Sequence, residues 1–145
     1  MVNSSRSYGR QVYHLIGSNP QSDKLRHDLV VRQIAYVNAL RCHLRRQQPF
    51  EDIANFLPDD EIRKLEGVSN IPNAILNRSA ELLSEAGKQG WLDSFKRVQI
   101  ETLLVEMSNA QGGMERIKNT PLPREYGYFP TLFVHFFCRS GWSIR

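Results

Sequence analysis

The sequence predicts an all-α protein, a helical bundle of about four to five helices. Apolar residues recur every three or four positions over several stretches, and glycines and prolines separate these stretches. No segment shows the alternation of apolar and polar residues that is typical of a half-buried strand. With 145 residues, 41% hydrophobic and 23% charged, the composition is ordinary for one folded domain.

Two helices are expected in the first third of the chain. Residues 6–16 carry apolar side chains at helical spacing, and Gly17 followed by a turn ends this first helix. Ser22 is suited to cap a second, longer helix, because its side chain can accept a hydrogen bond from a free backbone N–H group. The apolar period of this helix continues until Pro49.

Three further helical segments follow. Asp59, Asp60 and Glu61 are first-turn charges of a short helix that closes at Gly67, where carboxylates favour the positive end of the helix dipole. Residues 72–86 predict another helix, and a long last helix runs from about residue 93 to residue 119.

The last helix has a weak point and a firm end. Gly112 and Gly113 lie in its interior, where each glycine costs about 0.5 to 1 kcal/mol relative to alanine. The pair therefore indicates a bend or a close approach of another backbone. Pro121 and Pro123 cannot continue the helix, so it ends before them.

Catalytic and metal chemistry has no support in the sequence. Cys42 and Cys138 lie far apart, and the four histidines are scattered, so neither a disulfide framework nor a zinc site is indicated. No phosphate loop, nucleophile elbow or dinucleotide fingerprint is present. We expect no enzymatic activity, no cofactor and no metal.

The alternative function is a small basic helical module that binds nucleic acid. The net charge is +4, and six basic residues of the second expected helix could contact phosphates: Lys24, Arg26, Arg32, Arg41, Arg45 and Arg46. They are spread around the helix, and the last three also suit the dipole at its C-terminal end. A solvated face is the favoured interpretation, and no nucleic-acid partner is expected.

Residues 129–138, FPTLFVHFFC, form the most apolar run of the chain. The run resembles the opening turns of a membrane helix, but it is shorter than the roughly 18 apolar residues that a span needs. A short aromatic core segment is the alternative. Residues 139–145 are polar and basic, and they do not continue the apolar pattern.

A longer motif resembles a known family. Residues 115–123 read ERIKNTPLP; they follow LLVEMS at residues 103–108 and precede the tyrosines and apolar run of residues 126–138. This succession is similar to the bacterial bestrophin-like proteins, as is the helix of residues 22–46. The motif positions carried over from the family are Glu115, Arg116, Ile117, Asn119, Thr120, Pro121 and Pro123.

The resemblance implies a homopentameric ion channel of the bacterial inner membrane, through which chloride or monovalent cations pass passively. It places a cytosolic pore constriction near Val98, where a ring of apolar side chains would gate or select ions. The alternative is that Val98 belongs to the apolar stripe of a core-facing helix. The acidic calcium-binding cluster of eukaryotic relatives has no counterpart, so calcium activation is not expected.

We expect three segments: a bestrophin-like cytosolic helical region at residues 1–128, the truncated start of a transmembrane helix at 129–138, and an unrelated polar tail at 139–145. The chain is therefore expected to be a fragment of a channel subunit that reaches the membrane through missing segments and does not conduct by itself. Its helices should leave apolar surface exposed, and the isolated chain should associate.

Overall fold

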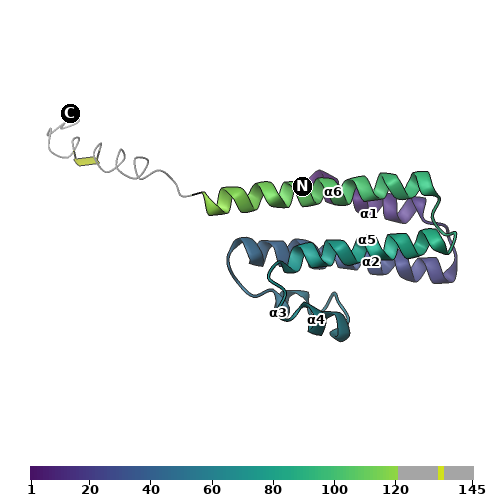
Figure 1. The fold of residues 1–145 in the computed structure, drawn as a ribbon, viewed down its shortest axis with the longest axis horizontal. Coiled ribbons are helices and arrows are strands. Elements are labelled where there is room, and N and C mark those ends of the chain that lie inside the picture. The colour runs from purple at the N-terminus through teal and green to yellow at the C-terminus, as the bar shows by residue number, and fades with distance from the viewer. Residues whose placement is uncertain (121–133, 136–145) are drawn as a thin grey trace, which may run out of the picture. The chain divides into compact units, whose positions relative to one another are not determined.

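The computed structural model describes residues 1–120 and 134–135, and this part of the chain is helical with no strand. Its elements, shown in Figure 1, are α1 (Val2–Leu15), α2 (Pro20–Leu44), α3 (Phe50–Ile53), α4 (Asp59–Leu65), α5 (Ile71–Lys88) and α6 (Ser94–Asn119). The predicted all-α class is confirmed. The chain divides into two units, Met1–Glu115 and Arg116–Arg145, and the first unit is the folded body described below.

The first unit is a bundle in which the four long helices run alternately up and down. Figure 1 shows α2 beside α5 and α1 beside α6. At one end, the turn after α1 meets the turn before α6, where the Gly17 N–H donates to the Trp91 carbonyl at 2.9 Å. A Cβ at Gly17 would lie 3.4 Å from the same Trp91 oxygen, so the two turns are in close contact.

The core lies between these four helices. Its largest fully buried apolar side chains come from all of them and include Tyr8, Leu29, Tyr36, Leu83 and Met107. Burying one such side chain contributes about 1.5 to 3 kcal/mol relative to leaving it exposed. The bundle is therefore held chiefly by the inward stripes that the apolar periodicity predicts.

The starts of the first two helices differ from the prediction. α1 begins at Val2 rather than residue 6, because the polar residues before residue 6 lack an apolar period but still form helical hydrogen bonds. α2 is capped by Asn19, with Pro20 as its first residue, so Ser22 is not the cap. Ser22 instead accepts a hydrogen bond from the Asn19 N–H at 2.8 Å.

The connection between α2 and α5 contains one predicted and one unpredicted helix. α3 is a single turn that the sequence does not indicate, because four residues are too few to show a period. α4 has the three predicted carboxylates in its first turn, and Gly67 after it has a φ of 84°, which confirms the left-handed end.

α6 agrees with the prediction in length, and one of the two alternatives for its glycine pair can be tested. The Asp93 carboxylate accepts from the Phe95 N–H at 3.1 Å at the start of the helix, and the helix ends at Asn119, before the prolines. Gly112 and Gly113 are helical, and a Cβ at either position would meet nothing within 4 Å. The expected close approach of another backbone at this pair is therefore not found among the described residues.

Within residues 1–120 and 134–135, no helix has both the length and the apolar character needed to cross a membrane. Of the apolar run at residues 129–138, only Val134 and His135 are described, and both are helical and exposed. The rest of that run and residues 139–145 lie outside the described residues. The predicted segment boundaries at residues 128 and 138 thus remain predictions.

Candidate functional site

α6 presents an exposed apolar face as well as a buried one. The side chains of Phe95, Val98 and Val105 are 83%, 57% and 59% exposed. Their spacing of three and seven residues places them on one side of the helix. The buried residues of α6, among them Ile100 and Leu104, lie on the opposite side.

Val98, the predicted constriction residue, is therefore not a core residue of this chain. The alternative that Val98 belongs to a core-facing stripe is wrong, because Val98 is exposed, as are Phe95 and Ile117. The buried stripe of α6 consists of Ile100, Leu103, Leu104 and Met107. The periodicity of apolar residues could not distinguish the buried side of α6 from its exposed side, because both sides carry apolar residues. A face that is apolar, exposed and opposite to the core is the candidate functional surface of α6.

Several polar groups beside this face are engaged within the chain. The Thr102 hydroxyl donates to the Val98 carbonyl at 2.8 Å, and the Arg97 guanidinium pairs with Glu101 at 3.4 Å. Glu106 accepts a hydrogen bond from the Ser4 hydroxyl of α1 at 3.1 Å. These contacts leave the valines and Phe95 as the principal groups that the face offers to a partner or to a solvent-filled path.

The inner side of α6 is fixed by α2. The Gln33 amide donates to the Met107 sulfur at 3.1 Å, and the Tyr36 hydroxyl donates to the Met107 carbonyl at 3.4 Å. Burial of the Tyr36 ring and the negative charge of Glu115 raise the pKa of Tyr36 to about 12. The hydroxyl therefore remains a neutral donor, and these contacts set which side of α6 faces outward.

Glu115, the first residue of the ERIKNTPLP motif, joins three helices. Its Oε1 accepts hydrogen bonds from Asn70 at the start of α5 at 3.2 Å and from Gln111 at 2.8 Å. It also lies 3.3 Å from Nε2 of His43, near the end of α2. Asn70 in turn caps α5 by accepting from the Asn73 N–H at 3.2 Å. The sequence marked Glu115 as a motif residue without indicating these partners.

The remaining motif residues make few contacts of this kind. Arg116, Ile117, Asn119 and Thr120 are exposed, and Ile117 is 75% exposed. The Thr120 hydroxyl donates to the Arg116 carbonyl at 2.8 Å within the last turn. Pro121 and Pro123 lie outside the described residues.

The basic residues of α2 do not form one phosphate-binding stripe. Arg32 is only 4% exposed and pairs with Glu61, so the expectation that it belongs to a solvated face is wrong. Arg26 pairs with Asp23, and Arg41 pairs with Asp52 at 2.9 Å. The alternative of a nucleic-acid-binding module thus gains no support from this helix.

The described residues contain no group of three or more histidine, cysteine or acidic side chains arranged to hold a metal ion. Cys42 is buried, and its thiol donates to the Asp52 carboxylate at 3.0 Å. Burial, reinforced by that carboxylate, raises the pKa of Cys42. This thiol is a structural donor and lacks the lowered pKa that a nucleophile requires.

Comparison with known proteins places this arrangement in a family. The family model described as "Bacterial/Fungal Bestrophin protein" matches residues 1–140. A voltage-dependent anion channel-forming protein of Ralstonia nicotianae, RSc3414, is 30% identical over 140 residues, which are 97% of this chain and 45% of that protein. The voltage-dependent anion channel-forming protein YneE of Salmonella typhi is 32% identical over 111 residues, 77% of this chain and 36% of the relative.

The fold is shared with solved structures. A crystal structure of a bacterial bestrophin homolog from Klebsiella pneumoniae matches with a TM-score of 0.81 and 23% identity, covering 93% of this chain and 49% of that one. The chain thus spans about half the length of that structure and 45% of the Ralstonia relative. The curated relatives are named for channel formation rather than catalysis, in agreement with the expectation of no enzyme. Since the family model matches residues 1–140, the chain belongs to the bacterial and fungal bestrophin family.

Proposed function

We propose that this chain is the cytosolic part of a subunit of a passive anion channel, and that α6 lines its conduction path. The observation that carries the proposal is the exposed apolar face of α6, with Phe95, Val98 and Val105 outward while the opposite side packs in the core. Relatives that match most of this chain are named as anion channel-forming proteins, which supports the ion class.

Val98 is the constriction residue in this proposal. Its side chain is 57% exposed on a helix that α2 holds by hydrogen bonds to Met107. A ring of valines contributed by identical copies would form a narrow apolar passage, in which an ion loses part of its hydration. Ring diameter would then control conductance, because a smaller side chain leaves more room for water.

The remaining parts of the proposal concern the assembly. We place five identical subunits around one pore, in the inner membrane of a bacterium, with chloride as the first permeant ion to test and monovalent cations as the alternative. Because this chain spans 45% of the Ralstonia relative, we propose that it acts as part of a longer subunit and does not conduct alone. Apolar surface left exposed elsewhere on the helices, such as Val37 of α2, would mediate association between copies.

A chimeric channel tests the proposal. The segment of the Klebsiella pneumoniae homolog that corresponds to residues 1–115 is replaced by this chain's sequence, and single-channel currents are recorded in planar bilayers under a chloride gradient. We expect conduction by the chimera and none by the chain alone. Val98→Ala should raise the unitary conductance, because the ring widens.

Val37→Ala is the matched control, since Val37 is a 43% exposed valine on α2 rather than on α6. The control should leave the conductance unchanged. Equal effects of the two substitutions would remove Val98 from the conduction path. A chimera that assembles in the membrane but carries no current would contradict the channel function itself.

A further inference from the structure

A cavity with a volume of about 300 Å³ lies beside α4, against α2 and α5, and the channel proposal does not use it. Its size is at the lower end of the range of about 300 to 1,000 Å³ that small-molecule sites occupy. One wall is charged and the rest is apolar. Five of its ten lining residues are charged and five are apolar, so the cavity suits a ligand that has one charged end and one apolar end.

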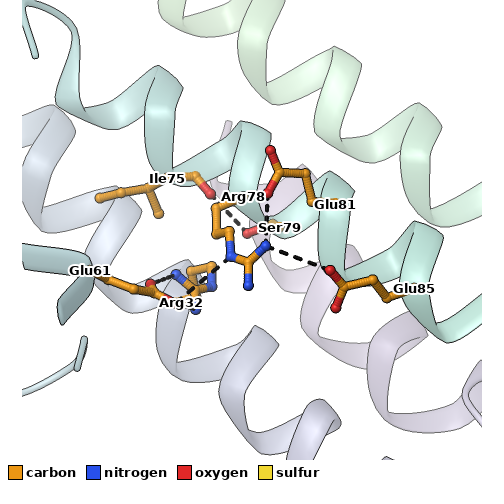
Figure 2. A network of polar contacts seen from close by, with 7 residues as sticks. All are labelled: Arg32, Glu61, Ile75, Arg78, Ser79, Glu81 and Glu85. Atoms are coloured by element: carbon orange, nitrogen blue, oxygen red, sulfur yellow. Dashed lines mark hydrogen bonds and ion pairs between the residues drawn. The ribbon is translucent and has the colours of Figure 1, made fainter. Parts of the chain in front are cut away.

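The charged wall is built around a buried arginine. Arg32 is 4% exposed, and its two terminal nitrogens bind the two carboxylate oxygens of Glu61, one of them at 2.8 Å. Arg78 of α5 reaches the same Glu61 carboxylate at 3.9 Å and Glu81 at 2.8 Å, as Figure 2 shows. The Nε atom of Arg32 is buried without a hydrogen-bond partner among the described residues.

The lining carries an excess of one positive charge. It contains three cations, Arg32, Lys64 and Arg78, and two carboxylates, Glu61 and Glu81. Lys64 is exposed and has no ion pair with any described residue, so it is the lining cation without a counter-charge.

One more carboxylate approaches this wall from outside the lining. Glu85 lies 3.7 Å from Arg78, but its side chain is 59% exposed. Glu81 is exposed to a similar degree, at 62%, so water screens both pairs alike. Arg78 is therefore matched by carboxylates, whereas Lys64 has none within ion-pair distance among the described residues.

The apolar wall comes from α5 and from the segment around α4. Leu57, Leu65 and Ile75 are buried and line the cavity, and Val68 lines it while remaining 38% exposed. An apolar ligand tail laid against this wall would remove part of the Val68 side chain from water, which is favourable in proportion to the apolar area covered.

We propose that this cavity binds a small aliphatic monocarboxylate. The carboxylate would bind Lys64, and the aliphatic tail would lie against Leu65, Val68 and Ile75. A single negative charge matches the unpaired Lys64, whereas a doubly charged anion such as a phosphate dianion would be repelled more strongly by Glu61 and Glu81. The site lies away from the exposed face of α6 and makes no use of the channel proposal.

Titration of the whole chain with hexanoate tests the site. Methyl groups of leucine and valine are labelled with ¹³C, and their NMR signals are followed as hexanoate is added. We expect saturable shifts at Leu65 and Val68, with dissociation constants at least about tenfold weaker for hexanol, which lacks the charge, and for acetate, which lacks the tail.

Lys64→Gln should weaken hexanoate binding by at least about tenfold, the effect of losing one charge-assisted hydrogen bond. Lys96→Gln is the control, because Lys96 is an exposed lysine of α6 that does not line the cavity. Val68→Ser, at a partly exposed position, should weaken binding of hexanoate but not of acetate. The proposal is overturned if hexanol binds as tightly as hexanoate, if Lys64→Gln has no effect, or if no saturable shift occurs. None of these results would bear on channel function.

Discussion

Oε1 of Glu115, on α6, lies 3.3 Å from Nε2 of His43, on α2. The same oxygen accepts hydrogen bonds from the side chains of Asn70 and Gln111. One carboxylate thus connects the end of α2, the start of α5 and the last turns of α6. Glu115 is the first residue of the ERIKNTPLP motif, so these contacts hold the start of the motif against α2 and α5.

Loss of the Glu115 carboxylate should destabilise the bundle. Glu115→Ala removes the acceptor of the Asn70 amide and one of the two acceptors of the Gln111 amide, which keeps its bond to Asn70. We expect the free energy of unfolding to fall by about 1 to 3 kcal/mol. Urea unfolding followed by circular dichroism measures this change. Arg116→Ala, at the next and exposed motif position, should stay within about 0.5 kcal/mol of the parent. Similar losses for both substitutions would contradict the role of Glu115.

Breaking the Arg32–Glu61 ion pair should lower the free energy of unfolding more than removing the Glu115 carboxylate does. Glu61→Ala would leave a guanidinium whose side chain is 5% exposed without its counter-charge, at a cost of about 3 to 5 kcal/mol. The control is Asp60→Ala, which breaks the exposed Asp60–Arg63 pair and should cost less than about 1 kcal/mol.

Replacing both members of the buried pair, Arg32→Met with Glu61→Leu, should recover much of the stability. The free energies of unfolding of the parent and the variants are compared by equilibrium unfolding. A loss below about 1 kcal/mol for Glu61→Ala would show that the guanidinium finds other solvation.

Cys42 should react slowly with alkylating reagents. Burial first and the Asp52 carboxylate second raise the pKa of its thiol, so less thiolate is present at mildly alkaline pH than in an ordinary cysteine. In a Cys138→Ser background, we expect the iodoacetamide rate to rise only at higher pH. Asp52→Asn removes a charge that opposes the thiolate, which should move the rate profile to lower pH. An unchanged profile in that variant would argue against the contact with Asp52.

Because the pKa of Tyr36 is raised, we expect the folded state to lose stability at alkaline pH. Its pKa is raised to about 12 from an ordinary value of 10.0, so the folded state retains a proton that the unfolded state releases. The contribution is complete below pH 10 and is lost as the pH rises from about 10 to about 12. The measurement is the melting temperature across this range.

Tyr36→Phe should flatten that alkaline decline, because phenylalanine has no proton to lose. The substitution also removes the hydrogen bond to Met107, which lowers the melting temperature equally at all pH values, so only the slope is diagnostic. The burial that raises the pKa of Tyr8 leaves part of the decline in place. Parallel curves for parent and variant would mean that Tyr36 does not titrate in this range.

Local signals in the sequence were sufficient for most helix boundaries. Gly17, Gly67 and the prolines after Asn119 end helices at or near the predicted positions, because their backbone preferences act without help from neighbours. Asn19 was missed as a cap in favour of Ser22. Both residue types cap helices, and Pro20, which is favoured at the first helical position, follows Asn19 directly.

The burial of the residues in the candidate site was harder to predict from the sequence. Val98 and Ile100 are both apolar and two positions apart, yet one is exposed and the other fully buried. Similarly, Arg32 was one of six basic residues expected on one helix. Unlike the others, it forms an ion pair with Glu61, which lies on α4. Composition and period do not carry this information, because burial depends on which elements pack together.

The sequence by itself determined the all-α class, the main helices and the family membership, since propensity, glycine and proline positions and the ERIKNTPLP string are local properties. Only the tertiary structure decided that Val98 faces outward, that Arg32 is buried against Glu61, and that Glu115 contacts His43 and Asn70. Such contacts join residues far apart in the chain, and their formation depends on how the helices rotate about their axes when the core packs.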